Sequence, residues 1–391
     1  MSDTTTAPLR VMTVFGTRPD TIKMAPVVFA LREAGPAVVP IVCATAQHRQ
    51  MLDELLELFA IGPDYDLDIM QREQTLTDIT TRVLRGMEDV LIKAKPDVVL
   101  VHGDTTTSTA AALAAFYARI PVGHVEAGLR TSTVDEPFPE ELNRRLTSVM
   151  AKFHFAPTER SKANLLAEKI DPTSVFITGN TVIDAFRATG DRVVADRPHV
   201  PALDGLDPDR PLIFVTAHRR ENHPAMEGIC NALARIVALP QRPQILWPVH
   251  PSPMVAPVAH RILDAVDGVR LVPPLGYADT VASILRSKFV LTDSGGLQEE
   301  APTLAKPVLV MRRETERPEG LDAGTLELIG SDPDDIVRES ERLLADETTF
   351  ARMAHANNPY GDGHAAQRIV SWLQWRLRNG ERPTEFSLRL A

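Results

Sequence analysis

Short apolar runs rich in β-branched residues alternate along the chain with longer segments in which apolar residues recur at helical spacing. The run Val11–Phe15 predicts a strand and is followed by a helical pattern over Asp20–Arg32. Val38–Cys43 predicts a second strand, followed by a helix over Arg49–Phe59. This alternation is typical of parallel sheets with helices on both faces.

The same alternation covers most of the remaining sequence. A helix is expected over Ser108–Tyr117, and a last one over about His364–Arg378, with Ile369, Val370 and Leu373 at helical spacing. Further strands are expected at Asp97–Val101, Pro121–Val125, Leu212–Thr216, Gln244–Trp247, Val269–Val272, Phe289–Thr292 and Pro307–Met311.

One segment interrupts the pattern, because Pro198, Pro201 and Pro208 stand there among scattered charges, which indicates a linker. The sequence therefore predicts two doubly wound, Rossmann-like α/β domains. The expected boundaries are 1–186 for the N-terminal domain, 187–210 for the linker, 211–363 for the C-terminal domain and 364–391 for a C-terminal helix that packs on either half, the N-terminal domain included. Ligands of open parallel sheets bind beyond the carboxyl ends of the strands, so the active site is expected in the interdomain cleft.

Composition narrows the class of protein. The net charge of -10 over 391 residues argues against nucleic acid as a partner, because phosphate neutralisation needs an excess of Lys and Arg. Cys43 and Cys230 are the only cysteines, which fits a reduced, cytoplasmic protein. The polar start lacks a signal-peptide core, and the longest apolar run, Ala110–Ala118, is too short to span a bilayer.

The stretch "DSGGLQEE" follows a predicted buried strand and suggests a phosphate or diphosphate site. Gly295 and Gly296 lack the β-carbons that would keep a ligand from the backbone, and Ser294 adds a hydroxyl donor beside a helix N-terminus. Glu300, about one turn on, is placed to accept from two neighbouring ribose hydroxyls. The alternative is a glycine-rich turn before a solvated acidic helix.

The N-terminal half has a similar turn in "VFGTRPDTIKMAP". Arg18 in the turn and Lys23 in the first helical turn are candidates to face an anion. The alternatives are an Arg18–Asp20 pair and a solvated Lys23. Asp104 and Glu126 follow two predicted strands, and parallel neighbours would bring both carboxylates to one sheet end, although Asp104 alone suits an N-cap.

Further charged residues follow strands or start helices. Glu140 and Arg144 are spaced i,i+4 on one predicted helix, either as a surface ion pair or as a catalytic carboxylate held by an arginine. His218 follows a strand and could bond a phosphate or transfer a proton, or else be an ordinary loop histidine. His250 is similarly placed, and Arg317 is a further cation near the Ser-Gly-Gly turn.

Several familiar signatures are missing from the sequence. It has no GxGxxG after a strand, no GxxxxGK[ST], no HExxH and no GxSxG. The 11 histidines show no metal-ligand spacing. Dehydrogenases, P-loop NTPases, zincins and lipase-type hydrolases therefore lose support, and no metal is expected.

At this point the motifs resemble a known family. "FGTRPDTIKMAP", "VHGDTTTS", "GHVEAGLRT", "PFPEELNRRL", "GNTVIDA", "TAHRREN", "DSGGLQEEAP", "KPVLVMRRETERPEG" and "NPYGDG" are similar to the non-hydrolysing UDP-N-acetylglucosamine 2-epimerases of bacteria, in the family's order and over nearly the whole chain. The resemblance implies a glycosyltransferase-B-like fold, interconversion of UDP-N-acetylglucosamine and UDP-N-acetylmannosamine without metal or nicotinamide cofactor, and a homodimer.

The resemblance also implies roles for residues. Those expected to hold UDP are Arg18, His218, Ser294, Gly295, Gly296, Glu300 and Arg317. The expected catalytic group is Asp104, Glu126, Glu140, Arg144 and Lys23, with His218. The implied route expels UDP to give a 2-acetamidoglucal and re-adds it, with protons on opposite faces of C2. Asp104 and Glu126 are the candidates for these transfers, with Glu140 as stabiliser or second base.

A second UDP-N-acetylglucosamine is expected as activator by the same likeness. The residues that resemble its site are Gln47, His48, Gln50, Arg219 and His250. Glu73 stands where some relatives carry Arg, and Thr280 where they often carry an aromatic residue, which weakens the likeness for activation and base stacking. The alternatives are a hydrolysing epimerase, a glycosyltransferase on the same fold and a non-catalytic nucleotide-sugar sensor.

Overall fold

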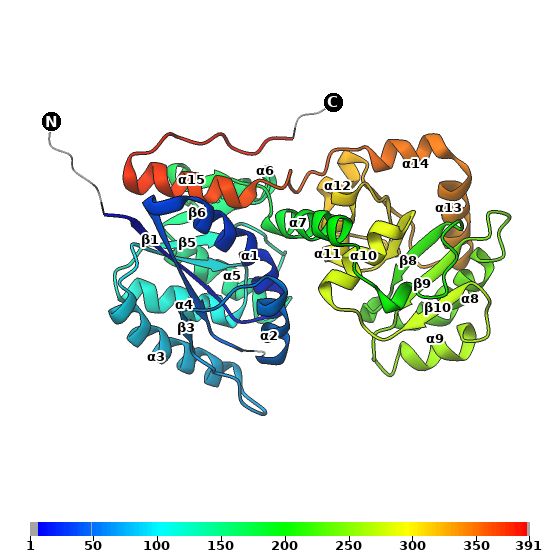
Figure 1. Ribbon diagram of the computed structural model, residues 1–391, viewed down its shortest axis with the longest axis horizontal. Helices are drawn as coiled ribbons and strands as arrows, with labels where there is room; N and C mark the ends of the chain where they lie inside the picture. The colour runs from blue at the N-terminus through cyan, green and yellow to red at the C-terminus, as the bar shows by residue number, and fades with distance from the viewer. Residues whose placement is uncertain (1–6, 48, 389–391) are drawn as a thin grey trace. The chain divides into compact units, whose positions relative to one another are not determined.

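The structure is a computed structural model that describes residues 7–47 and 49–388. It divides into two compact units, each built on its own sheet (Figure 1). The first unit contains the described residues up to Ala185 together with Gly361–Ser387, and the second contains Phe186–Tyr360. The chain therefore leaves the first unit once and returns to it.

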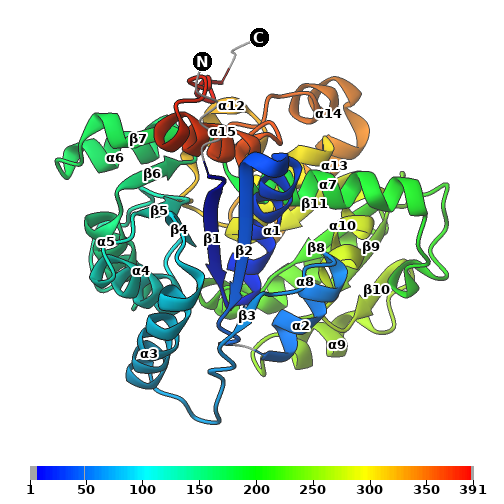
Figure 2. The same cartoon turned by 60° about the vertical axis from the view of Figure 1, so that its left-hand side comes forward.

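The first unit has a seven-stranded parallel sheet in the order β3-β2-β1-β4-β5-β6-β7 (Figure 2). Its strands are β1 (Leu9–Phe15), β2 (Val38–Ala44), β3 (Tyr65–Asp66), β4 (Val98–His102), β5 (Val122–Val125), β6 (Phe153–Ala156) and β7 (Val175–Ile177). Its helices are α1 (Arg18–Glu33), α2 (Arg49–Leu58), α3 (Leu76–Ala94), α4 (Thr106–Tyr117), α5 (Glu140–Met150), α6 (Glu159–Ala167), the start of α7 (Thr181–Asp196), and α15 (Ala365–Arg378). Short 3₁₀ turns lie at Gly35–Ala37 and Pro172–Ser174.

Strand β1 shows why its sequence is apolar at nearly every position. Val11 and Phe15 point into a core with helices α1 and α15, whereas Met12 and Val14 point into a second core with α3 and α4. A strand covered on both faces cannot alternate between apolar and polar residues.

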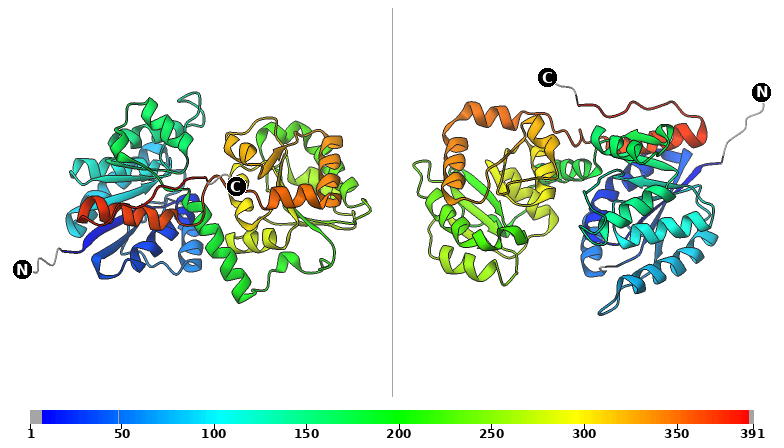
Figure 3. Two further views of the ribbon diagram at one scale, coloured as in Figure 1. Left: turned by 90° about the horizontal axis from the view of Figure 1, so that it is seen from above. Right: turned by 180° about the vertical axis from the view of Figure 1, so that it is seen from behind.

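The second unit has a six-stranded parallel sheet in the order β10-β9-β8-β11-β12-β13, with helices on both faces (Figure 3). Its strands are β8 (Leu212–Thr216), β9 (Gln244–Pro248), β10 (Val269–Val272), β11 (Phe289–Thr292), β12 (Val308–Val310) and β13 (Leu326–Leu328). Its helices are the rest of α7, α8 (Met226–Ile236), α9 (Ala256–Leu263), α10 (Tyr277–Arg286), α11 (Gly295–Glu300), α12 (Pro318–Ala323), α13 (Pro333–Ala345) and α14 (Glu347–Ala354). Its 3₁₀ turns are Pro201–Leu203, Arg220–Ala225 and Ala301–Leu304.

Both sheets confirm the predicted fold class of two doubly wound α/β domains. In each, the strand order reverses beside the first strand, between β1 and β4 in the first unit and between β8 and β11 in the second. Ligands of doubly wound sheets bind at such switch points, beyond the carboxyl ends of the strands. The residues that follow these four strands are therefore the first to inspect.

The linker expected over residues 187–210 begins later than predicted, because α7 continues to Asp196. Gly190 lies within this helix, and a β-carbon added there would come within 2.9 Å of the Leu304 side chain. Residues 187–196 therefore form a helix that packs against Leu304, and not a linker. The returning chain forms α15, which lies along α1 and contributes the fully buried Trp372 to the first unit (Figure 1). None of the described helices is long and apolar enough to cross a membrane.

Candidate functional site

The turn after β1 is closed by a buried carboxylate. Asp20 accepts the Thr17 N–H at 2.7 Å and the Thr17 hydroxyl at 2.6 Å, and so caps the start of α1. Burial raises the pKa of Asp20, and these hydrogen bonds oppose that rise. Arg18, the first residue of α1, therefore does not pair with Asp20, and its half-buried guanidinium has no ion-pair partner among the described residues.

Three side chains surround the carboxylate of Glu126. Its Oε1 lies 2.5 Å from the Lys23 ammonium and accepts from the Asn180 amide at 2.8 Å, and its Oε2 lies 3.2 Å from Nε2 of His102. Glu126 is only 8% exposed. Its φ of 62° is left-handed, which costs a residue with a β-carbon roughly 1–2 kcal/mol, so the surroundings must hold it there.

The charge state of Glu126 follows from these contacts. Burial alone would raise the pKa of this carboxyl, but the Lys23 ammonium and the His102 imidazole outweigh burial and hold the pKa well below its ordinary value. Glu126 is therefore ionised at neutral pH, with a cation against one of its oxygens.

Asp104 is held by an arginine and is not a helix cap. The Arg144 guanidinium donates from Nε at 2.9 Å and from Nη2 at 2.8 Å, both to Oδ2 of Asp104. Oδ1 of Asp104 has no partner within the described part of the chain, and the side chain is 30% exposed. The N-cap of α4 is Thr105, whose hydroxyl accepts from the Ser108 N–H, so the N-cap alternative for Asp104 is wrong.

The partner of Arg144 on its own helix is not the one expected. Its Nη1 donates to the fully buried Glu141 at 2.6 Å, three residues earlier, and the pairing of Arg144 with Glu140 is therefore wrong. Spacings of three and four residues share a helix face, so the sequence alone did not separate these two glutamates. Glu140, the first residue of α5, is partly exposed and has no ionic partner in residues 7–47 and 49–388.

These residues lie at the carboxyl ends of the strands of the first sheet. Strands β4 and β5 pair in parallel with His102 opposite Val125, so Asp104 and Glu126 both follow the same ends of neighbouring strands. Of the residues expected in the activator site, Gln47 accepts from the Thr107 hydroxyl at 2.7 Å, at the start of α4. Gln50 is exposed on α2, and His48 lies outside the described residues.

In the second unit the sequence analysis missed the central residue, Asp293. It is fully buried directly after β11, and its Oδ2 accepts the backbone N–H groups of His218 and Arg219, each at 2.9 Å, and the Asn222 amide at 3.1 Å. Asp293 thereby ties the turn after β8 to the turn after β11, across the switch point. A carboxylate immediately before Ser294, at the end of a strand predicted to be buried, was the available signal.

His218 is stacked against a second histidine. Its ring lies 5.7 Å from that of His250, at an interplanar angle of 19°, and its Nδ1 lies 3.4 Å from Oδ1 of Asp293. Burial lowers the pKa of His218, and Arg219 and His250 lower it further, although Asp293 opposes this. A neutral imidazole at neutral pH follows, able to donate one hydrogen bond and to accept another.

The Ser-Gly-Gly turn lies against the side chain of Arg317, and the approach of a ligand to it stays a prediction. A β-carbon added to Gly295 would lie 2.6 Å from Nη1 of Arg317. Arg317 also donates from Nε to Glu299 at 2.7 Å. Ser294 is the N-cap of α11 and its hydroxyl makes no capping bond, and the Glu300 carboxylate lies near Gly296 at the far end of this short helix.

Each unit carries its own set of charged and polar groups beyond its strands. The first has carboxylates with cationic partners, and the second has Arg317, His218 and the Ser294 hydroxyl around a glycine turn. Among the described residues, no three His, Cys, Asp and Glu side chains form a group that could hold a metal ion.

The chain is similar over most of its length to proteins of one known family. The family model "UDP-N-acetylglucosamine 2-epimerase" matches residues 31–374. The UDP-N-acetylglucosamine 2-epimerase of Escherichia coli (strain K12) is 53% identical over 371 residues, which cover 94% of this chain and 98% of that protein. The enzyme of the same name from Bacillus subtilis (strain 168) is 50% identical, over 97% of this chain and 99% of its own.

Solved structures of UDP-N-acetylglucosamine 2-epimerases are similar to this chain as well. The structure of UDP-GlcNAc 2-epimerase from Neisseria meningitidis bound to UDP-GlcNAc is 46% identical, with a TM-score of 0.83, and the match covers 93% of this chain and 99% of that one. A glycosyltransferase from Rickettsia africae, 12% identical with a TM-score of 0.62, shares the fold alone.

Proposed function

This chain belongs to the UDP-N-acetylglucosamine 2-epimerase family, and from that premise we propose that it interconverts UDP-N-acetylglucosamine and UDP-N-acetylmannosamine without hydrolysis. The observation that carries the proposal is the group of carboxylates and cations beyond β4 and β5, where Lys23 meets Glu126 and Arg144 meets Asp104. A sugar ring that loses an anionic leaving group needs negative charge beside it, and these acids supply it.

The proposed reaction has two halves. In the first, the C1–O bond to UDP breaks and C2 gives up its proton to a carboxylate, leaving a 2-acetamidoglucal with a C1–C2 double bond. In the second, UDP adds back to C1 while a proton reaches C2 from the other face. The hydrogen on C2 is not next to a carbonyl, so direct removal without loss of UDP would be slow.

The contacts of the three carboxylates support a division of roles. Both oxygens of Glu126 have protein neighbours, and its lowered pKa makes it a weak base, so we assign it to stabilising the sugar cation. Oδ1 of Asp104 and the carboxylate of Glu140 have no ionic partner among the described residues. We therefore assign the two proton transfers at C2 to Asp104 and Glu140, in place of Asp104 and Glu126.

For the nucleotide, we assign the diphosphate to the cations and donors that the sequence motifs suggest. Arg18 and Arg317 would neutralise the charge that develops as UDP leaves, with Lys23 close to the reacting sugar. The Ser294 hydroxyl and a neutral His218 would donate to phosphate oxygens, and Gly295 and Gly296 would allow the ligand to approach the backbone. Glu300 would accept from the ribose hydroxyls.

A single incubation tests the reaction. UDP-N-acetylglucosamine is incubated with the protein in deuterated water, and the epimer is expected to carry deuterium at C2 by mass spectrometry. Quantitative release of UDP with free N-acetylmannosamine would contradict the non-hydrolysing route and favour a hydrolysing epimerase. Absence of both products at saturating substrate would favour a nucleotide-sugar sensor.

We propose a second, activating UDP-N-acetylglucosamine, with Gln47 and Gln50 of the first unit as candidates to bind it. The support is that Gln47 accepts a hydrogen bond from Thr107 in the first turn of α4. Asp104 directly precedes the N-cap of this helix, so a ligand at Gln47 would act on the helix beside a catalytic carboxylate. The expected result is a sigmoidal rate curve against substrate that becomes hyperbolic in Gln47→Ala.

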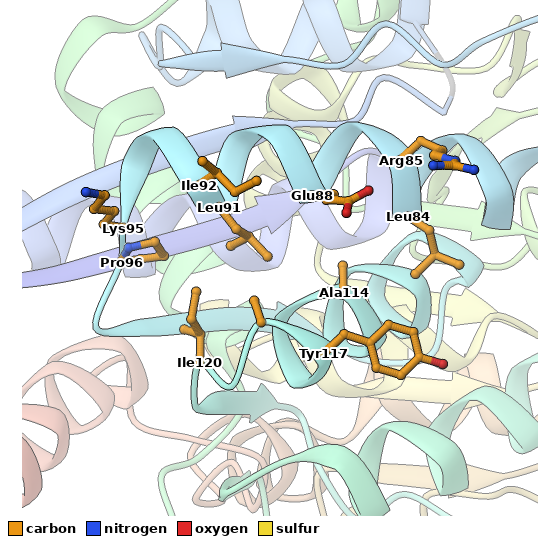
Figure 4. Close-up of a pocket in the computed structure, with 11 residues that line it drawn as sticks. Leu84, Arg85, Glu88, Leu91, Ile92, Lys95, Pro96, Ala114, Tyr117 and Ile120 are labelled. Carbon is orange, nitrogen blue, oxygen red and sulfur yellow. The ribbon is translucent and has the colours of Figure 1, made fainter.

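We also propose a homodimer through an apolar face of the first unit. A cavity of about 680 Å³ lies between α3 and α4, lined by Leu84, Ile92, Ala114 and Tyr117 among others (Figure 4). Ile92 is 66% exposed and Tyr117 70% exposed. Arg85, Glu88 and Lys95 also line the cavity, so exposed apolar side chains lie there beside charges of both signs. We propose that a second copy of this chain covers this surface, and Ile92→Glu is expected to yield monomers in sedimentation velocity.

A further inference from the structure

A short segment of the second unit holds both partners of the Arg317–Glu299 ion pair by their backbones. The Asn358 amide donates to the backbone carbonyl of Glu299 at 2.8 Å. The Tyr360 hydroxyl donates to the backbone carbonyl of Arg317 at 3.0 Å and accepts the Gly320 N–H at 3.1 Å. The Asn358 side chain also accepts the Tyr360 N–H at 3.0 Å, so the two residues form one brace.

The Tyr360 hydroxyl acts where a capping side chain is normally found. Arg317 is the N-cap of α12, but a guanidinium has no acceptor for the first N–H groups of a helix. The Gly320 N–H is one of those groups, and the Tyr360 oxygen accepts it. Tyr360 is only 4% exposed, and without its hydroxyl the Gly320 N–H would keep only the longer bond to the Arg317 backbone carbonyl, at 3.3 Å.

The guanidinium itself has little freedom once its backbone is fixed. Its Nη1 lies over Gly295, where an added β-carbon would come within 2.6 Å, and its Nε donates to Glu299 at 2.7 Å. The Arg317 side chain is 21% exposed. The Glu316 carboxylate lies 3.4 Å from Nη1. The direction of the guanidinium is therefore set by the backbone at residue 317, by Glu299 and by Glu316, and the brace holds the first two of these by their backbones.

We propose that Tyr360 is a positioning residue for Arg317, and that through this hydroxyl it sets the affinity of the protein for a nucleoside diphosphate. The inference rests on the proposed function, in which Arg317 binds the diphosphate of UDP. The inference adds Tyr360, which would act on the ligand only through its hydrogen bond to the backbone carbonyl of Arg317. Preorganisation of a cation strengthens binding because less side-chain freedom is lost when the ligand arrives.

The test removes only the hydroxyl. Tyr360→Phe keeps the ring, and we expect the Kd for UDP in titration calorimetry to rise about 3- to 10-fold, the loss of one or two hydrogen bonds. The KM for the UDP-sugar should rise with the Kd, while kcat changes less than about 2-fold. Tyr65→Phe is the matched control, because the Tyr65 hydroxyl makes no hydrogen bond to the described residues, and its Kd should equal that of the wild type.

A double-mutant cycle separates positioning from general destabilisation. In an Arg317→Ala background, adding Tyr360→Phe should change the Kd for UDP by less than about 2-fold, because the group that Tyr360 positions is gone. An equal loss in both backgrounds, or no loss in the wild-type background, would overturn the inference. If Arg317→Ala itself leaves the Kd unchanged, the diphosphate role of Arg317 fails, and the positioning role fails with it.

Discussion

The Lys23 ammonium lies 2.5 Å from the Glu126 carboxylate, and the carboxylate side chain is 7% exposed. Taking an ion pair out of water is costly unless further hydrogen bonds hold it, and here Asn180 and His102 complete the surroundings of Glu126. An arrangement that costs stability and lies at the carboxyl ends of parallel strands, next to a sheet switch point, is typical of a functional site.

Lys23→Met should slow epimerisation at least about 100-fold, because it leaves a buried carboxylate without its nearest cation. Lys23 lowers the pKa of Glu126, so its loss raises that pKa and moves the acidic limb of the kcat–pH profile to higher pH. The measurement is kcat between pH 4.5 and 8. Lys93→Met, at an exposed position of α3, should reproduce the wild-type profile. A profile that does not move would contradict the coupling of the two residues.

Asp104→Asn should lower kcat by about 100-fold or more and leave the Kd for UDP within about 2-fold. The amide keeps the shape of the carboxylate beside Arg144 but neither accepts a proton nor provides negative charge. Coupled assays for product and calorimetry for UDP give the two quantities on one preparation. Full turnover by this variant would remove the catalytic role and favour the sensor hypothesis.

Gly295→Ala should weaken UDP binding about 10-fold. The new methyl would lie 2.6 Å from Nη1 of Arg317, so the guanidinium has to move away from its place over the turn. Gly276→Ala is the control, since a β-carbon there meets nothing within 4 Å. Calorimetric titration with UDP compares the two, and equal affinities would show that the place of Arg317 is immaterial to binding.

Glu300→Ala should weaken UDP binding about 5- to 20-fold, as expected for lost hydrogen bonds from a charged acceptor. The discriminating ligand is 2′-deoxy-UDP. If Glu300 accepts from the ribose hydroxyls, the variant should lose less affinity for the deoxy nucleotide than for UDP. Equal losses for both ligands would place the effect elsewhere than the 2′-hydroxyl.

Asp184 should make stability depend on pH. It accepts the N–H groups of Ala365 and Ala366 at the start of α15, and burial raises its pKa to about 6, from 3.8 in the unfolded chain. Between these values the folded state binds a proton that the unfolded state does not, so the free energy of unfolding falls as pH rises.

Asp184→Asn removes this titration. Relative to the wild type, the variant should gain up to about 3 kcal/mol between pH 4 and pH 7, measured by urea unfolding with tryptophan fluorescence. Asp191→Asn, at an exposed position of α7, should run parallel to the wild type. A wild-type curve parallel to that of Asp184→Asn would contradict the raised pKa.

The apolar pattern predicted the fold well where strands are long and buried. Leu212–Thr216 and Phe289–Thr292 were predicted with their observed bounds, because both lie fully inside a parallel sheet. Four strands of two to four residues were missed, because such short runs carry little pattern: Tyr65–Asp66, Phe153–Ala156, Val175–Ile177 and Leu326–Leu328.

The site was predictable in its residue types more than in its pairings. Helical spacing allowed Arg144 to reach either Glu140 or Glu141, and only tertiary packing buries Glu141. Likewise two glutamates follow the glycines, and Glu299, not Glu300, meets Arg317. Asp293 acts on backbone N–H groups brought from 74 and 75 positions away in the chain, a relationship that no local spacing contains.

The return of the chain to the first unit has a consequence for biosynthesis. Trp372 packs edge-on against Phe153 and Phe155, so the aromatic centre of the first unit lacks a member until residue 372 has been made. Residues 186–360, which form the second unit up to Tyr360, are made before that tryptophan. A released chain that ends at residue 360 should therefore show protease resistance in residues 186–360 and not in the first half, the reverse of the usual order in which N-terminal domains mature.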